Sequence, residues 1–169
     1  LGIKTLYLSS PNTLAGISGR IRTWGRIIGQ SEKGDQLAFD FDRNLEEIRA
    51  SLAKIESGPR IYHDEAPGWW TAGSNSLAND IYEFLNAQNV FSDVDGYAQV
   101  SIEEIIARDP EVIVSVHPGA LDLLASEPGL QGVSAITNDR AVNLNGDLLS
   151  IPGPRVLDGI KALASSIYE

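Results

Sequence analysis

The sequence predicts an α/β protein in which helices cover a parallel sheet. Apolar residues at helical spacing alternate along the chain with short β-rich runs, as in strands joined by helical crossovers. The run VIVSV at residues 112–116 has the apolar, β-branched character of a strand buried on both faces. One helix, much longer than the others, separates residues 1–29 from residues 58–169. We therefore expect a parallel-sheet lobe, preceded by an interdomain helix over residues 30–57 and by a strand and helix left from another lobe.

Composition narrows the possible functions. Of the 169 residues, 43% are hydrophobic and 21% are charged, as in ordinary globular proteins, and no apolar stretch approaches the ~20 residues of a membrane span. The formal charge of −10 argues against a nucleic-acid partner and against adhesion to an anionic membrane. The absence of Cys excludes disulfides and thiolate metal sites. Because Met is also absent, we interpret the chain as a processed product or fragment without its targeting segment.

The first 29 residues contain one strand pattern and one helix pattern. Residues 2–9 form a short β-rich run that a Pro-Asn pair ends. Thr13 can cap a helix that Gly29 closes. The apolar positions of this helix are Ile17, Ile21, Trp24 and Ile28. Because a lone strand and helix cannot bury their apolar faces, residues 1–29 are expected to be the end of an amino-terminal lobe.

The strongest periodic signal lies in the next segment. Its apolar residues recur at steps of four, four, three, four and three, which predicts one stripe on a helix from about residue 31 to residue 56. They are Leu37, Phe41, Leu45, Ile48, Leu52 and Ile55. The other positions are mostly charged or polar, so we expect this helix to lie on a surface, and the Ser-Gly-Pro sequence at residues 57–59 to end it.

Residues 58–169 read as one complete lobe. The expected strands are residues 61–63, 112–116 and 141–144, and the expected helices are residues 76–87, a helix headed by Ser101, and residues 153–168. Glu104 stands three residues after Ser101, as in a capping box.

Patterns of catalysis are missing. Neither His63 nor His117 belongs to a metal-ligand spacing, and the chain contains no phosphate-binding glycine loop and no nucleophile elbow. A zinc site would need both His residues and carboxylates from distant loops, so structural or loop roles are favoured for them. The acidic pairs, Asp40 with Asp42 and Asp93 with Asp95, are better explained as surface charge and loop capping than as cation sites. We expect neither an enzyme nor a resident cofactor or metal.

Three loops contain candidate ligand-binding residues. Trp69 and Trp70 are adjacent in a glycine-flanked loop, where either one packs inward while the other covers a domain edge, or both form a wall for a bulky organic ligand. Tyr97 lies in a second loop, and Asp147 and Leu148 lie in a third. In an open parallel sheet such loops meet at the carboxyl edge of the strands, where ligands bind.

Several segments resemble a known family. They are the helix ending at Gly29 with its continuation over residues 31–56, WWTAGSNS from Trp69, residues 97–116, LQGVSAITNDRAVNL, and residues 147–160. Together they resemble the class III solute-binding proteins of ABC importers, which serve vitamin B12, ferric siderophores, haem and some oxyanions. The resemblance implies two α/β lobes joined by one long helix, with the ligand held between them.

The resemblance also implies roles for individual residues. Trp70 and Tyr97 match cleft aromatics of the vitamin B12-binding member, and Asp147 matches an Asp that contacts the corrinoid. Ile151 stands where that member has an Arg. Glu103 matches the acidic knob that docks onto an Arg of the permease, although a Glu there also suits the dipole of the helix.

The expected function is therefore extracytoplasmic binding of a corrinoid and its delivery to an ABC permease. A ferric siderophore or haem is the alternative ligand. Two other classes remain open: a metal-dependent or cofactor-assembly domain that uses His63, His117 and Asp147, and a free-standing regulatory domain. Because most of the first lobe is missing, we expect the chain alone to bind ligand weakly or not at all. We also expect self-association through the stripe of the long helix and the faces around Ile17, Ile21 and Ile28.

Overall fold

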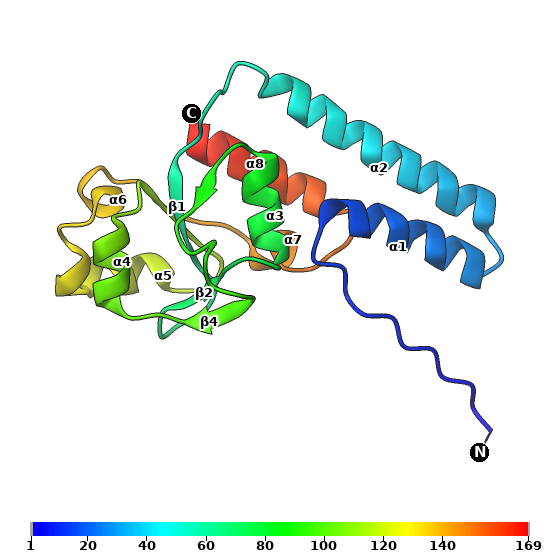
Figure 1. Ribbon diagram of the computed structural model, residues 1–169, viewed down its shortest axis with the longest axis horizontal. Coiled ribbons are helices and arrows are strands. Elements are labelled where there is room, and N and C mark those ends of the chain that lie inside the picture. Colours follow the sequence, from blue (N-terminus) through cyan, green and yellow to red (C-terminus); the bar gives the residue numbers. More distant parts are fainter. Residues whose placement is uncertain (1, 169) are drawn as a thin grey trace.

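The computed structural model describes residues 2–168 and has the predicted α/β architecture (Figure 1). Its central sheet has the strand order β3-β1-β5-β6, and every pairing in it is parallel. The strands are β1 (Arg60–Asp64), β3 (Gln88–Asn89), β5 (Val112–Ser115) and β6 (Ala141–Asn143). β5 is buried along its whole length, as its apolar sequence predicts. The order places β1 and β5 at the centre, where their carboxyl ends lie side by side.

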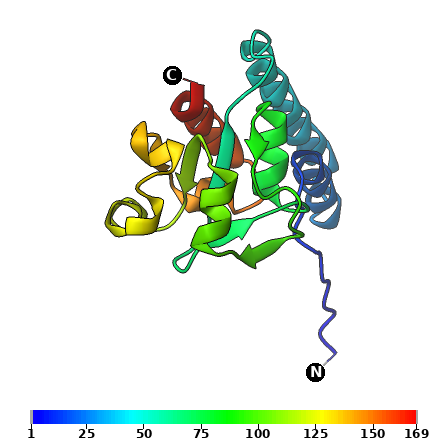
Figure 2. The ribbon, with the colours of Figure 1, turned by 60° about the vertical axis from the view of Figure 1, so that its left-hand side comes forward.

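Helices cover both faces of this sheet (Figure 2). Ile61, Val112 and Val114 face the larger core, because successive side chains of a strand point to opposite sides. This core also contains residues of α1 (Leu14–Ile27), α2 (Ser31–Ser51), α3 (Leu77–Phe84), α7 (Gly146–Leu149) and α8 (Val156–Tyr168). Tyr62 and Ile113 face the second core. Residues of α4 (Ile102–Arg108), α5 (Ala120–Ser126), the 3-10 turn η1 (Pro128–Leu130) and α6 (Ser134–Thr137) pack there.

The predicted helix starts are confirmed by their caps. Thr13 accepts a hydrogen bond from the Gly16 amide and Ser76 accepts one from Asn79, which satisfies amides that the first helical turn leaves unpaired. Ser101 and Glu104 form the expected capping box at the start of α4. Asp109 ends α4 in the left-handed conformation. The helix starts could be predicted because each cap depends on residues close in sequence.

A second sheet was not predicted. β2 (Trp70–Ala72) and β4 (Tyr97–Gln99) pair in antiparallel fashion, with Trp70 opposite Gln99 and Ala72 opposite Tyr97. Each strand has three residues, too few to establish an alternating pattern. The pairing joins the loop that follows β1 to the segment that follows β3, so both lie at the carboxyl edge of the main sheet (Figure 1).

Two sequence expectations are wrong in detail. Residues 2–9 form no strand, because no neighbouring strand in the described chain supplies hydrogen bonds to them, and the segment extends away from the body (Figure 1). The long helix ends at Ser51 rather than near residue 56. Backbone hydrogen bonds of the 3-10 type follow the helix. The Ala53 amide donates to the Ala50 carbonyl oxygen, and the Ile55 amide donates to the Leu52 carbonyl oxygen. This turn keeps Leu52 and Ile55 on the core although the helix has ended.

The helices α1 and α2 cross at two glycines. A Cβ atom built on Gly34 would lie 2.8 Å from the Cα atom of Gly25, and the converse distance is the same. Only residues without side chains allow so close an approach. As a result, Gly34, Ala38 and Phe41 begin the buried stripe of α2, whereas Leu37, which was predicted to belong to it, is 53% exposed.

Candidate functional site

An open cavity of about 540 Å³ lies at the carboxyl edge of the main sheet. Its polar lining comes from the segments that follow β1, β5 and β6, which all end at this edge. The polar lining residues are Glu65, His117, Asn143, Asn145, Asp147 and Ser150. Gly146 allows the last of these segments to pass close to β5, since a Cβ atom there would lie 2.5 Å from the Val116 carbonyl oxygen.

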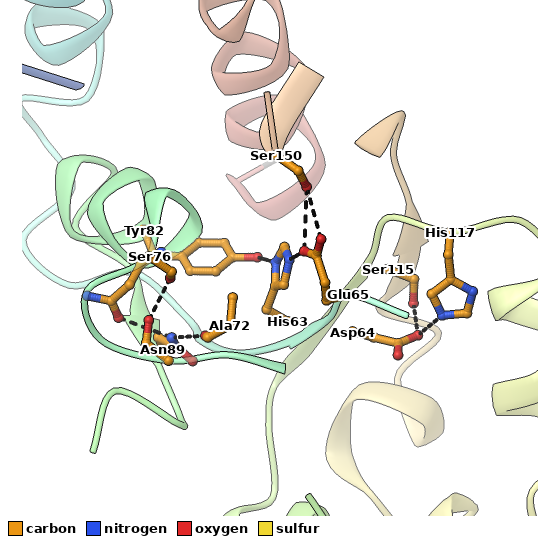
Figure 3. Close-up of polar contacts among 12 residues, drawn as sticks. His63, Asp64, Glu65, Ala72, Ser76, Tyr82, Asn89, Ser115, His117 and Ser150 are labelled. Carbon is orange, nitrogen blue, oxygen red and sulfur yellow. Dashed lines mark hydrogen bonds and ion pairs between the residues drawn. The ribbon is translucent and has the colours of Figure 1, made fainter. Parts of the chain in front are cut away.

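Glu65 is held at the cavity by a buried relay (Figure 3). His63 Nδ1 lies 2.6 Å from the Tyr82 hydroxyl, and His63 Nε2 lies 2.8 Å from Oε2 of Glu65. His63 and Tyr82 are buried, whereas the Glu65 side chain remains 24% exposed. Burial, and secondarily the charge of Glu65, raise the pKa of Tyr82 well above its usual value, so this phenol keeps its proton. With the Tyr82 O–H donating to Nδ1, the proton on Nε2 is directed to Glu65.

A second polar cluster lies beside the first, on the same edge (Figure 3). Ser115 Oγ donates to Oδ2 of Asp64 at 2.8 Å, and His117 Nε2 lies 2.9 Å from the same oxygen. Asp64 is fully buried, and its Oδ1 atom has no hydrogen-bond partner within residues 2–168. Burial raises the pKa of Asp64, while the bonds from Ser115 and His117 act in the opposite direction.

The aromatic candidates separate into two roles. Trp69 has a positive φ of 64° and packs against the second core, whereas Trp70 is 41% exposed. Tyr97 is 49% exposed and lies diagonally across the β2–β4 ladder from Trp70, on the same face. The Glu65 amide donates to the Trp70 carbonyl oxygen at 2.8 Å, which ties this ladder to the cavity. Burial and the nearby Glu65 charge both raise the pKa of Tyr97.

Other predicted site residues lie as follows. Asp147 lines the cavity and is exposed, with its amide bonded to the Asn145 side chain. Leu148 does not line this cavity, because its backbone and Cβ atom lie against Gly159 of α8. Glu103 is exposed in the first turn of α4, while its neighbour Glu104 turns back to cap the helix. Ile151 is exposed beside Ser150.

Sequence reasoning missed Glu65 and its support. The available signal was its position directly after β1, because the residue that follows a parallel strand lies at the edge where ligands bind. No such signal indicated the role of Tyr82, because it lies on α3, 19 residues after His63, and contacts His63 only in the folded chain. Within residues 2–168, no three His, Asp or Glu side chains are grouped so that they could hold a metal ion. His63 and His117 instead bond to separate carboxylates.

Comparison with known proteins places the chain in a family. The family model described as periplasmic binding protein matches residues 1–148. An uncharacterized ABC transporter substrate-binding lipoprotein of Bacillus subtilis is 25% identical, with 99% of this chain and 54% of that protein covered. A vitamin B12-binding protein of Vibrio campbellii is 30% identical, with 92% of this chain and 57% of that protein covered. The chain therefore spans little more than half the length of these relatives.

A solved structure agrees with these matches. The crystal structure of a possible iron-binding, periplasmic solute-binding protein from Staphylococcus epidermidis has a TM-score of 0.92 and 27% identity, covering 99% of this chain and 67% of that one. These proteins are binding proteins rather than enzymes, which confirms the prediction that the chain is not catalytic. Within the described residues, no helix has the length and apolarity needed to cross a membrane.

Proposed function

The chain belongs to the periplasmic binding protein family, in the class III group of ABC importers, and from this premise we propose that it forms the ligand-binding wall of a corrinoid uptake protein. The single observation that supports the ligand most strongly is the pair Trp70 and Tyr97, half-exposed on one face beside a polar cavity. A corrinoid has a broad apolar ring edge and peripheral amides. The aromatic pair suits the first, and Glu65 and Asp147 can accept hydrogen bonds from the second.

A ferric siderophore or haem is the second candidate. The related Staphylococcus epidermidis structure, described as possibly iron-binding, favours it. A ligand of this kind also has an extended planar or apolar surface for the aromatic pair. The two candidates differ in their charged groups, because the carboxylates of haem or of many siderophores would meet Glu65 and Asp147, which carry the same sign.

We further propose that the three segments of the chain have distinct roles. Residues 58–169 would form the carboxy-terminal ligand-binding lobe, residues 30–57 the interdomain helix, and residues 1–29 the end of the amino-terminal lobe. α2 supports this assignment, since its buried stripe packs on α1 and on the larger core while much of its surface stays exposed. The protein would act outside the cytoplasm, as the lipoprotein relative from Bacillus subtilis suggests. Nucleic acid is not expected as a partner, given the formal charge of −10.

Glu103 is proposed as the contact with the permease. It is exposed in the first turn of α4, where the capping box holds the helix start rigidly. Replacing it should weaken docking of the ligand-loaded protein to the permease without changing ligand affinity. The substitution Glu103→Arg in a vesicle-docking assay tests this role. Equal docking by the variant and the unchanged protein would remove Glu103 from the interface.

Competition binding distinguishes the ligand candidates. The whole protein that contains this chain is equilibrated with cyanocobalamin, a ferric hydroxamate or haemin, each at the same concentration range. Our proposal predicts that cyanocobalamin displaces the other two and that neither displaces cyanocobalamin at equal concentration. Preferential retention of haemin or the ferric hydroxamate would replace the corrinoid with the second candidate.

A further inference from the structure

Apart from His117, the ionisable side chains that line the cavity at the carboxyl edge are all acidic. Its polar lining contains two carboxylates, Glu65 and Asp147, and no Lys or Arg stands among the described residues that line it. Ile151, at the position where the resemblance implies an Arg, is an exposed apolar residue next to Ser150. A ligand that enters this cavity therefore meets negative charge at these two carboxylates, beside the polar side chains of His117, Asn143, Asn145 and Ser150.

Glu65 is built into the cavity rather than being a loose surface carboxylate. Its Oε2 atom is 2.8 Å from Nε2 of His63, a side chain that is 1% exposed, and its Oε1 atom accepts from Ser150 Oγ at 3.3 Å (Figure 3). The Tyr82 hydroxyl, 2.6 Å from the other nitrogen of His63, fixes the imidazole from behind. Because a carboxylate oxygen has room for two donors, Oε1 of Glu65 retains acceptor capacity, whereas Oε2 also lies 3.5 Å from Ser150 Oγ.

The backbone fixes the same residue relative to the aromatic pair. The Glu65 amide donates to the Trp70 carbonyl oxygen at 2.8 Å, which fixes the Glu65 backbone beside the β2–β4 ladder, while His63 and Ser150 hold its carboxylate. The Glu65 charge also contributes to the raised pKa of Tyr97, which places the two groups within electrostatic reach of each other. A ligand that rests on Trp70 and Tyr97 would thus present its polar edge to Glu65.

We infer that Glu65, positioned by His63 and Tyr82, is a specificity-determining residue that selects ligands whose edge presents neutral or cationic N–H donors and rejects ligands that present carboxylates there. The inference rests on the proposed binding of an organic ligand against Trp70 and Tyr97. It adds a criterion, the presence of N–H donors rather than carboxylates at the ligand edge, that applies equally to corrinoids, siderophores and haem. Peripheral amides and a free ammonium group satisfy the criterion, whereas a propionate or citrate group does not. A carboxylate would meet like charge, and the part of the chain that the structure describes places no Lys or Arg in the cavity lining to offset it.

The test measures affinities by calorimetric titration of the whole protein that contains this chain. Four probes are used: cyanocobalamin, its derivative with one side-chain amide hydrolysed to a carboxylate, ferrioxamine B with its free ammonium group, and haemin. The variants are Glu65→Gln, which removes the charge at constant size, and Glu32→Gln, a matched change on α2 outside the cavity lining.

The unchanged protein should bind the amide and ammonium probes about tenfold more tightly than the carboxylate probes, a preference that Glu65→Gln should reduce to about threefold or less. Glu32→Gln should leave the preference intact. Binding of cyanocobalamin with the same preference in Glu65→Gln as in the unchanged protein would overturn the inference and spare the proposed function. If ferrioxamine B binds, cyanocobalamin does not, and Glu65→Gln weakens the binding of ferrioxamine B, the proposed corrinoid function is overturned and the inference about Glu65 stands. If the folded whole protein binds none of the probes, both are overturned.

The imidazole gives a second readout that a purely structural role would not produce. The ¹⁵N shifts of His63 should report a proton on Nε2 and none on Nδ1, since the Tyr82 O–H donates to Nδ1. Tyr82→Phe removes the donor to Nδ1 while keeping the ring, so the imidazole should be held less firmly and the preference for N–H donors should fall. A proton on Nδ1 in the unchanged chain would contradict the relay.

Discussion

The Glu65 amide donates a hydrogen bond to the Trp70 carbonyl oxygen at 2.8 Å, and this bond joins the polar cavity to the aromatic ladder. Through it, the backbone of Glu65, which follows β1, lies beside the backbone of Trp70, an exposed indole at the start of β2. An amphipathic ring system needs this combination, because its apolar edge requires an aromatic contact and its substituents require acceptors. The relationship supports the assignment of ligand binding to this edge.

Removal of the exposed aromatics should weaken ligand binding. We expect Trp70→Ala or Tyr97→Ala to cost about 1–3 kcal/mol of cobalamin affinity in the whole protein, because each removes a large side chain from the contact. Trp24→Ala and Tyr7→Ala serve as matched controls, since these side chains are exposed outside the cavity lining. Calorimetric titration measures the change. An unchanged affinity in both cleft variants would indicate another ligand or another surface.

The crossing of α1 and α2 gives a stability prediction. Gly34→Ala should lower the free energy of unfolding by about 1–3 kcal/mol, because its Cβ atom would lie 2.8 Å from the Gly25 Cα atom and the two helices would have to separate. Gly19→Ala, in open space on the same helix pair, should instead raise it by about 0.5–1 kcal/mol. Urea denaturation provides both values. Equal effects of the two substitutions would show that the close crossing does not limit packing.

The buried carboxyl of Asp64 predicts a pH dependence. Its pKa is raised above the usual 3.8, so in the range just above 3.8 the folded state holds a proton that the unfolded state has lost. The contribution of this group to the free energy of unfolding therefore falls as pH rises from 3.8 through the raised pKa. Asp64→Asn removes the dependence. The free energy of unfolding of the variant, minus that of the unchanged chain, should therefore be larger at pH 7 than at pH 3.

Asp109 supplies a control of opposite sign for the same experiment. Bonds from the Ser134 amide and hydroxyl lower its pKa, so the stability it provides is present above pH 3.8 and is lost as pH falls through the lowered pKa. Asp109→Asn should therefore be less stable than the unchanged chain at pH 7, with a difference that shrinks toward pH 3. Thermal unfolding at several pH values measures both variants. Parallel curves for either variant would contradict the assigned cause.

Self-association was expected through the stripe of the long helix and the faces around Ile17, Ile21 and Ile28, but Ile17 and most of the stripe are buried. The apolar surface that the helix pair does expose still predicts self-association of the chain. Trp24, Ile27 and Ile28 of the α1 end are exposed, as are Leu37 and Phe39 of α2. Together they leave apolar area in contact with water, which favours pairing between copies. Light scattering should show a concentration-dependent mass above 18.2 kDa, reduced by Phe39→Ser. A constant monomer mass and no binding of an apolar dye would exclude this prediction.

The sequence predicted what depends on local pattern. The caps of Thr13, Ser76 and Ser101 and the buried run of β5 depend on residues within a few positions, and each appears where it was expected. The β2–β4 ladder was missed, because its three-residue strands are joined by pairing between distant segments. The predicted end of the long helix lay too far along the sequence, because Leu52 and Ile55 keep the apolar spacing through a turn that follows the helix.

The candidate site was predicted only in part, for the same reason. Asp147 was found in the segment after β6, whereas Trp70 and Tyr97 were found as aromatic residues of expected loops and through the resemblance, and they instead begin β2 and β4. Trp69 was also proposed as a ligand contact, but its positive φ lets it pack inward against the second core, one of the two outcomes that adjacent Trp residues allowed. The support of Glu65 by His63 and Tyr82 joins two elements, so no spacing in the sequence could indicate it.

Calorimetric titration of the whole protein with cyanocobalamin tests the central claim most directly. Our account predicts saturable binding of one corrinoid per protein with a dissociation constant of about 1 μM or tighter, equivalent to roughly −8 kcal/mol or better. It also predicts that Trp70→Ala weakens this binding. The absence of saturable heat at millimolar cyanocobalamin, with the protein folded, would contradict the assignment of a corrinoid to this cavity.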